Sequence, residues 1–177
     1  GTSVQAIDYG ALKERLLAGG QMLDFVAPAA ASGHGVNKAK LAGVVVDDTE
    51  ATLKGFEATG HVSGNYVGDG YRHDANAEKG AMTARFTPAL PAAGSYRVAV
   101  SYSINGNRAT NVPVTIHHTQ GETKVLVNQR LKPSDGLFHI VGTFEFVAGK
   151  DGWVEISNAG TDGHVIVDAV QWLPVKR

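Results

Sequence analysis

From Val44 to the C-terminus, the sequence is a series of short apolar segments with period two, separated by turns rich in glycine, proline and asparagine. Alternate side chains lie on one face of a β-strand, whereas an amphipathic helix needs apolar residues every three or four positions. About eight or nine such segments follow one another with no helical pattern between them. The series therefore predicts an all-β fold, an antiparallel β-sandwich of jelly-roll type.

The same period predicts which side chains form the core. Segments such as AMTARFT (81–87) and GWVEIS (152–157) place apolar residues on one face and mostly polar residues on the other. Trp172, in the last segment, is also expected in the core. The residues expected to face inward are Met82, Ala84, Phe86, Tyr96, Val98, Val100, Tyr102, Val112, Val114, Ile116, Phe138, Ile140, Phe144, Phe146, Val154 and Ile156.

Residues 1–43 have a different character. Asp8 is a good N-cap for a short helix near residues 8–18, in which Tyr9, Leu12 and Leu16 share one face. Because so short a helix is marginal alone, its apolar stripe is expected to pack against another surface. A linker rich in alanine and glycine follows. We expect an N-terminal helix and linker over 1–43 and a β-sandwich module over 44–177.

Composition excludes several classes of function. The net charge of -1 gives no electrostatic attraction to nucleic acid or to an anionic membrane. No apolar run approaches the roughly 20 residues that cross a bilayer. With no cysteine, the chain has no disulfide, no thiolate zinc site and no cysteine nucleophile. The motifs G-x-S-x-G, H-E-x-x-H and the P-loop are also absent, so we expect no catalytic residue.

The segment HVIVDAVQWLP (164–174) raises a specific question, because it is apolar on both faces and carries Asp168 at its centre. A buried carboxylate without a partner is strongly destabilising. The first and last strands of such sandwiches commonly pair, which would bring Asp47 or Asp48 close to Asp168.

Three kinds of partner for Asp168 remain open. Backbone N–H groups of the segment 66–73 could donate to it, an arginine could form a fork with it, or Asp47 and Asp168 could bind a structural calcium ion. Arg72 and Arg108 are the candidate arginines, and Arg72 is the first choice. Asp168 would then hold the 66–73 segment in shape rather than touch a ligand.

Residues 56–80 form a long stretch with glycine throughout and no period. Loops of that length are usually functional or disordered, and Tyr66 and Tyr71 favour an ordered, functional loop. With Arg72, the tyrosines supply the flat apolar faces and hydrogen-bond forks that sugars need. Packing of the loop onto the sandwich explains them equally well. DANAE (74–78) matches the start of a calcium loop but lacks its later glycine and glutamate.

Two further places could contact a sugar. Asn107 and Arg108 lie in the polar segment SINGNRATNVP (103–113), although asparagine is also common in turns. Trp153 shares an outward face with Glu155, and is either a sugar platform or a surface on which the N-terminal helix packs. His117 and His118 are adjacent on a strand and face opposite ways, so they cannot bind one metal together.

Several segments, in this order, resemble the golvesin C-terminal / xanthan lyase carbohydrate-binding-like domain of bacteria. They include VVVDD, GDGYRHD, FTPALPAAGSYRVAVSY and GTDGHVIVDAVQW, and they extend from Val44 to Leu173. The resemblance implies an accessory β-sandwich of an exported bacterial protein, extracellular or periplasmic. A second resemblance, carried by VQAIDYGALKERLLAGGQML, is to the closing segment of bacterial FAD-dependent oxidoreductases and implies such a parent enzyme.

Three functions are therefore considered. The chain is a noncatalytic module that binds polysaccharide, a docking domain that packs on its own catalytic domain, or a polysaccharide lyase domain. No cofactor is expected apart from the calcium that Asp47 and Asp168 could hold. The expected ligand-binding residues are Tyr66, Tyr71, Arg72, Asn107, Arg108 and Trp153.

Overall fold

A computed structural model describes residues 34–176 of the chain. The helix expected near residues 8–18, and most of the region 1–43, lie outside the described residues. Within 34–176, helical structure is limited to two short 3-10 turns, η1 (Lys38–Lys40) and η2 (Asp48–Glu50). The described part of the chain contains no helix long and apolar enough to cross a membrane.

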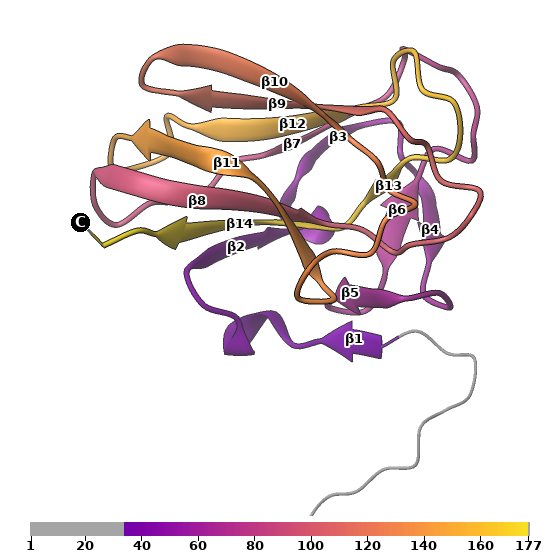
Figure 1. Cartoon of the computed structure of the whole chain (residues 1–177), viewed down its shortest axis with the longest axis horizontal. Coiled ribbons are helices and arrows are strands. Elements are labelled where there is room, and N and C mark those ends of the chain that lie inside the picture. Colours follow the sequence, from indigo (N-terminus) through magenta and orange to yellow (C-terminus); the bar gives the residue numbers. More distant parts are fainter. Residues whose placement is uncertain (1–33, 177) are drawn as a thin grey trace, which may run out of the picture. The chain divides into compact units, whose positions relative to one another are not determined.

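Two antiparallel sheets form the body of the fold and lie face to face (Figure 1). One has the order β11 (Phe138–Phe146), β8 (Gly94–Ser101), β14 (Ala169–Pro174), β2 (Val44–Asp47). The other has the order β10 (Gly121–Val127), β9 (Val112–His118), β12 (Trp153–Ser157), β7 (Thr83–Phe86), β3 (Thr52–Lys54). The predicted β-sandwich is confirmed, and β2 pairs with β14 as expected of the first and last strands.

The stretch 56–80 contains short strands rather than one long loop. β4 (Ala58–Gly60) and β6 (Tyr71–His73) pair with β13 (Ile166–Val167) in a three-stranded sheet at one end of the sandwich (Figure 1). β5 (Asn65–Val67) pairs in parallel with β1 (His34–Val36). Strands of three residues are too short to show a period, which is why the sequence pattern missed them.

The core lies between the two large sheets, and the period-two prediction of its members is largely confirmed. Trp172 is 0% exposed and is among the largest fully buried side chains. Met82 and Phe144 are partly buried against the core. The prediction that Ile140 faces the core is wrong, since its side chain is 45% exposed. A bulge between Ile140 and Gly142 adds one residue to β11, so the face reverses and Val141 contacts the core instead.

The last segment is also interrupted. It was expected as one strand, but β13 ends at Val167, β14 begins at Ala169, and Asp168 lies between them. β13 belongs to the small sheet and β14 to the four-stranded sheet. Asp168 therefore stands where the chain passes from one sheet to the other.

Candidate functional site

Asp168 is completely buried, with 0% of its surface exposed. Its Oδ2 accepts hydrogen bonds from the backbone N–H of Val67, at 2.9 Å, and from the hydroxyl of Ser101, at 2.8 Å. Val67 is the last residue of β5 and Ser101 the last of β8. The carboxyl group thus joins the 66–73 segment to the four-stranded sheet. Of the three kinds of partner considered for Asp168, the structure shows backbone N–H, together with a serine hydroxyl.

Within residues 34–176, no arginine forms a hydrogen bond or an ion pair with Asp168. Burial raises the pKa of its carboxyl well above the usual value, and the charges of Asp47 and Asp48 raise it further. The hydrogen bonds from Ser101 and Val67 lower this pKa, but they do not offset the effect of burial. The expected pairing with Arg72 is wrong, because the Arg72 Nε lies 3.9 Å from Asp48 Oδ2 instead.

Arg72 lines a cleft of about 290 Å³ that we call the arginine cleft. It lies between the end of β2 and the small sheet, where Thr59 of β4 is opposite Arg72 of β6. Gly68 and Gly70 contribute backbone to its wall. The polar and charged side chains in its lining include Asp47, Asp48, Thr59, His61, Asp69 and Arg72.

The carboxyl groups of the cleft differ in their surroundings. Asp47 accepts a hydrogen bond from the Thr49 hydroxyl at 2.7 Å, and the Glu50 carboxylate accepts one from the Asp47 backbone N–H at 3.0 Å. Burial, followed by the charge of Asp47 and a hydrogen bond with it, raises the pKa of Asp48 to about 7, while Arg72 opposes the shift. Near neutral pH, Asp48 therefore exists both as a hydrogen-bond donor and as an acceptor.

Calcium binding by Asp47 and Asp168 stays a prediction. In residues 34–176, no three His, Asp or Glu side chains are grouped so as to hold a metal ion. Asp168 already accepts bonds from protein donors, so only Asp47 has a carboxylate oxygen without a hydrogen-bond partner.

Four of the predicted binding residues pack together, and one of them, Tyr71, also lines this cleft. The rings of Tyr66 and Tyr71 meet edge to face, with centroids 5.8 Å apart, and the Arg108 guanidinium lies 5.8 Å from the Tyr71 ring. Arg108 also donates to Asn107 Oδ1 at 2.8 Å and to the backbone oxygen of Ser103 at 2.8 Å. Tyr66 and Tyr71 are only 6% and 5% exposed. They support the cleft and do not offer an open face to a sugar.

Trp153 lies away from this group, on the outer face of the five-stranded sheet. The His117 ring of β9 stacks on it with centroids 5.0 Å apart, and the Arg85 guanidinium of β7 lies 3.8 Å from its ring. β9 and β7 flank β12 on its two sides. The outward direction is as predicted, but neighbouring side chains already occupy the indole.

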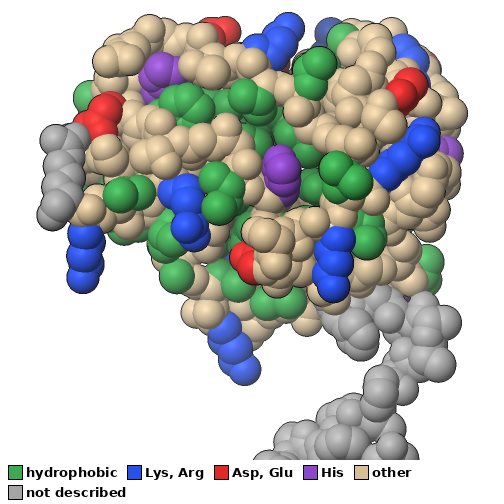
Figure 2. Space-filling view, viewed as in Figure 1, with side chains coloured by type: hydrophobic (Ala, Val, Ile, Leu, Met, Phe, Trp, Pro, Cys, Tyr) green, Lys and Arg blue, Asp and Glu red, His purple; other side chains and the backbone are tan. Residues whose placement is uncertain are grey.

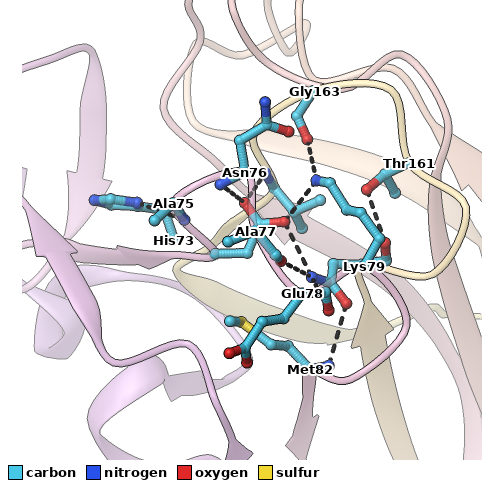
Figure 3. A network of polar contacts seen from close by, with 12 residues as sticks. His73, Ala75, Asn76, Ala77, Glu78, Lys79, Met82, Thr161 and Gly163 are labelled. Carbon is cyan, nitrogen blue, oxygen red and sulfur yellow. Dashed lines mark hydrogen bonds and ion pairs between the residues drawn. The ribbon is translucent and has the colours of Figure 1, made fainter.

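The pattern of the sequence missed a polar network beside the small sheet (Figure 3). Asn158 is fully buried; its side chain accepts from the N–H groups of Gly80 and Met82 and donates to the Asp74 carboxylate at 3.1 Å. Lys79 donates to the same carboxylate at 2.8 Å. Burial opposes ionisation of Asp74, but these bonds hold its pKa below the usual value. The DANAE segment is thus fixed by an ion pair and an amide, which only the fold brings together.

Charge is dispersed on the face of the described residues that Figure 2 shows. On the face seen in Figure 2, charged side chains stand singly among apolar and uncharged atoms. That face has no broad basic or acidic patch, in keeping with the net charge of -1.

Comparison with known proteins identifies the family. The model of the Golvesin C-terminal domain matches residues 44–173. The chain belongs to this family. A xanthan lyase of Bacillus sp. (strain GL1) is 38% identical to this golvesin C-terminal domain over an alignment of 142 residues, and the alignment covers 77% of the chain and 15% of that protein. The chain thus spans a small part of the length of its curated relative.

Solved structures agree with this assignment. A Paenibacillus xanthan lyase superposes with a TM-score of 0.71 at 34% identity, covering 75% of the chain and 13% of the lyase. A family 35 carbohydrate binding module from Clostridium thermocellum superposes with a TM-score of 0.52 at 15% identity, covering 76% of the chain and 100% of the module. The second likeness shows the shared fold. The predicted resemblance to the golvesin C-terminal / xanthan lyase domain is confirmed, and that to FAD-dependent oxidoreductases stays a prediction.

Proposed function

We propose that this golvesin C-terminal domain is a noncatalytic accessory module that binds polysaccharide in the arginine cleft. The observation that carries the proposal is the convergence of a guanidinium, carboxyl groups, a hydroxyl and an imidazole on one cleft of about 290 Å³. Sugar hydroxyls both donate and accept hydrogen bonds, and such a mixed lining can satisfy both. Asp168 acts behind the cleft, where it positions the segment that ends β5.

The relatives support a carbohydrate ligand. Xanthan lyase is named for the polysaccharide on which it acts, and it carries a segment 38% identical to this chain. A carbohydrate binding module shares the fold. In this role the domain would work outside the cytoplasm, extracellular or periplasmic, as part of a larger bacterial protein.

The proposal is tested by electrophoresis of the chain through gels that contain xanthan or other polysaccharides. Retardation of the wild type is expected. Among the described residues, Arg72 is the one arginine that lines the cleft. Loss of a charged donor costs roughly 1.5–3 kcal/mol, so Arg72→Ala should lower the affinity about ten- to a hundredfold. Arg97→Ala, in the middle of β8 and outside the lining of the cleft, is the matched control and should migrate as the wild type does. Unretarded migration of the wild type in every gel would contradict the proposal.

A docking domain is the second candidate. The observation that favours it is the exposure of large apolar side chains, with Val62, Leu126 and Leu131 each 61% or more exposed. Such residues suit packing against the parent enzyme's own catalytic domain. This alternative would be supported if the chain bound no polysaccharide but bound its separately expressed parent domain. Leu126→Ser should then abolish binding to the parent domain.

A lyase domain is the least supported of the three functions. We expect incubation of the isolated chain with xanthan to give no unsaturated uronate ends, measured by their ultraviolet absorbance. Heat-denatured chain provides the blank. A steady rise in absorbance with the folded chain alone would overturn the noncatalytic assignment.

A further inference from the structure

A second cleft lies on the other side of the three-stranded sheet. Its volume is about 320 Å³, and we call it the glutamate cleft after Glu57 and Glu78 in its lining. Along β4 and β6, the pair Thr59 and Arg72 belongs to the arginine cleft, and the next pair, Ala58 and His73, belongs to the glutamate cleft. Because side chains alternate along a strand, the two pairs face opposite sides of the sheet.

The backbone around the glutamate cleft is held in an uncommon conformation. Four non-glycine residues of the segment 34–176 have left-handed φ angles: Phe56, Ala75, Asn76 and Glu78, at 55°, 52°, 57° and 46°. Three of them line this cleft, and Asn76 follows one of them in the chain. Each costs of order 1 kcal/mol or more. The Asn158 and Asp74 network of Figure 3 holds the loop against that cost, so the cleft has a fixed shape.

The charges in the cleft have one sign. Glu57 and Glu78 are exposed, and in the described part of the chain neither carboxylate has a hydrogen-bond or ion-pair partner. No lysine or arginine is in the lining. Burial lowers the pKa of His73, and the charges of His164 and Arg108 lower it further, so the imidazole is neutral near pH 7. Its Nδ1 accepts from the Ala75 N–H at 3.1 Å, and the ring also interacts with the Thr59 backbone.

We propose that the glutamate cleft is a second sugar site, which binds an amino sugar through its protonated amine. The ammonium group would donate to Glu57 and Glu78, which both line the cleft. The apolar part of the lining is made by Ala58, Ala75, Ala77 and Met82, and it suits the face of a sugar ring better than a flexible lysine chain. That carbohydrate is the ligand class rests on the proposed function.

The test is an NMR titration of the ¹⁵N-labelled chain with four probes of matched length. They are a glucosamine tetrasaccharide, its N-acetylated form, a galacturonate tetrasaccharide and tetralysine. The glucosamine tetrasaccharide should shift the amides of Glu57, His73 and Glu78 and bind at least tenfold more tightly than the other probes. Equal binding of the acetylated probe, or tighter binding of tetralysine, would overturn the proposal.

Variants separate this site from the arginine cleft. Glu57→Gln and Glu78→Gln, both at exposed positions, should each weaken the glucosamine probe about tenfold by removing one charge-assisted bond. Asp151→Asn, which removes an exposed carboxylate outside the cleft, should have no effect. Unchanged affinity in both glutamine variants would also overturn the proposal.

Failure of the two proposals can be told apart. Arg72→Ala should weaken binding in the polysaccharide gels and leave the affinity for the glucosamine tetrasaccharide unchanged. Glu57→Gln and Glu78→Gln should weaken binding of the glucosamine tetrasaccharide and leave retardation in the polysaccharide gels unchanged. Retardation by polysaccharide without any glucosamine binding would overturn the second site alone. Glucosamine binding that persists in a chain unretarded by every polysaccharide gel would uphold the glutamate cleft and reject the arginine cleft.

Discussion

At the scale of single residues, Asp168 shows how much the identity of a partner changes the expected cost of a mutation. A carboxylate paired with arginine or calcium would leave a charge unpaired when replaced. Asp168 instead accepts from a backbone N–H and a serine hydroxyl, and burial keeps its own pKa high. Its hydrogen-bond partners are neutral donors, so what a substitution loses is hydrogen bonding and volume.

Asp168→Asn should therefore destabilise the domain by only about 1 kcal/mol. The amide keeps one acceptor oxygen for Val67, and the Ser101 hydroxyl can rotate to accept from the new amine. Asp168→Ala should cost about 3 kcal/mol, because it leaves both donors unsatisfied and creates a cavity. Urea denaturation of the two variants beside the wild type measures both values. Equal losses of more than about 4 kcal/mol in both variants would point to a charged partner after all.

Asp48 makes a prediction about pH. Its pKa is about 7 in the folded chain and near 3.8 without the fold, so folding takes up a proton between these values. The stability that this proton contributes is present below about pH 4 and is lost as the pH rises through 7. Asp48→Asn cannot ionise, so it should lose less stability than the wild type between pH 4 and 8, by up to roughly 4 kcal/mol. Parallel urea midpoints for the two proteins across that range would contradict the shift.

At the scale of elements, the segment between β6 and β7 depends on one side chain from the other end of the sequence. Asn158 follows β12, and its amide makes bonds with Asp74, Ala77, Gly80 and Met82. These bonds hold a loop whose φ angles are unfavourable by themselves. The strained backbone of the loop and Asn158, whose hydrogen bonds offset the strain, are about 80 residues apart in the sequence.

Asn158→Ala should cost about 3 kcal/mol in the free energy of unfolding and should release this loop before the rest of the fold opens. Hydrogen exchange is the direct measurement, since the amides of Gly80 and Met82 lose their acceptor while those of β8 keep theirs. Asn107→Ala, in the exposed turn before β9, serves as the control. Uniformly faster exchange over all strands would show that Asn158 supports the whole sandwich and not the loop.

At the scale of the whole molecule, the described residues indicate that the sandwich is held by its apolar core. The two sheets bury a continuous cluster that includes Phe86, Tyr102, Ile116 and Trp172. We expect a calcium chelator to leave the melting temperature of the wild type unchanged, because no group of three ligand side chains forms in residues 34–176. A fall in melting temperature on chelation, absent in Asp47→Asn, would establish the calcium site predicted at Asp47 and Asp168.

The sequence by itself determined the large sheets and most of the core. Period two in segments of about five to nine residues is a local property, and each segment records which of its faces is buried. The prediction failed at Ile140, where a bulge reverses the period, and at β4 to β6, whose three residues are too few to show one. The sequence also predicted that Asp168 is buried, because a strand with apolar residues on both faces must be covered on both sides.

Only the tertiary structure decided what surrounds each polar residue. Arg72 lies beside Asp48 and not Asp168, and Asn158 meets Asp74 across 84 positions of sequence. Neither pairing leaves a trace in local pattern, because it depends on where distant strands end and which way their side chains alternate. The two clefts have the same origin. Adjacent residues of β6 face opposite sides of one small sheet, and whether each finds a cleft depends on the loops that the fold brings there.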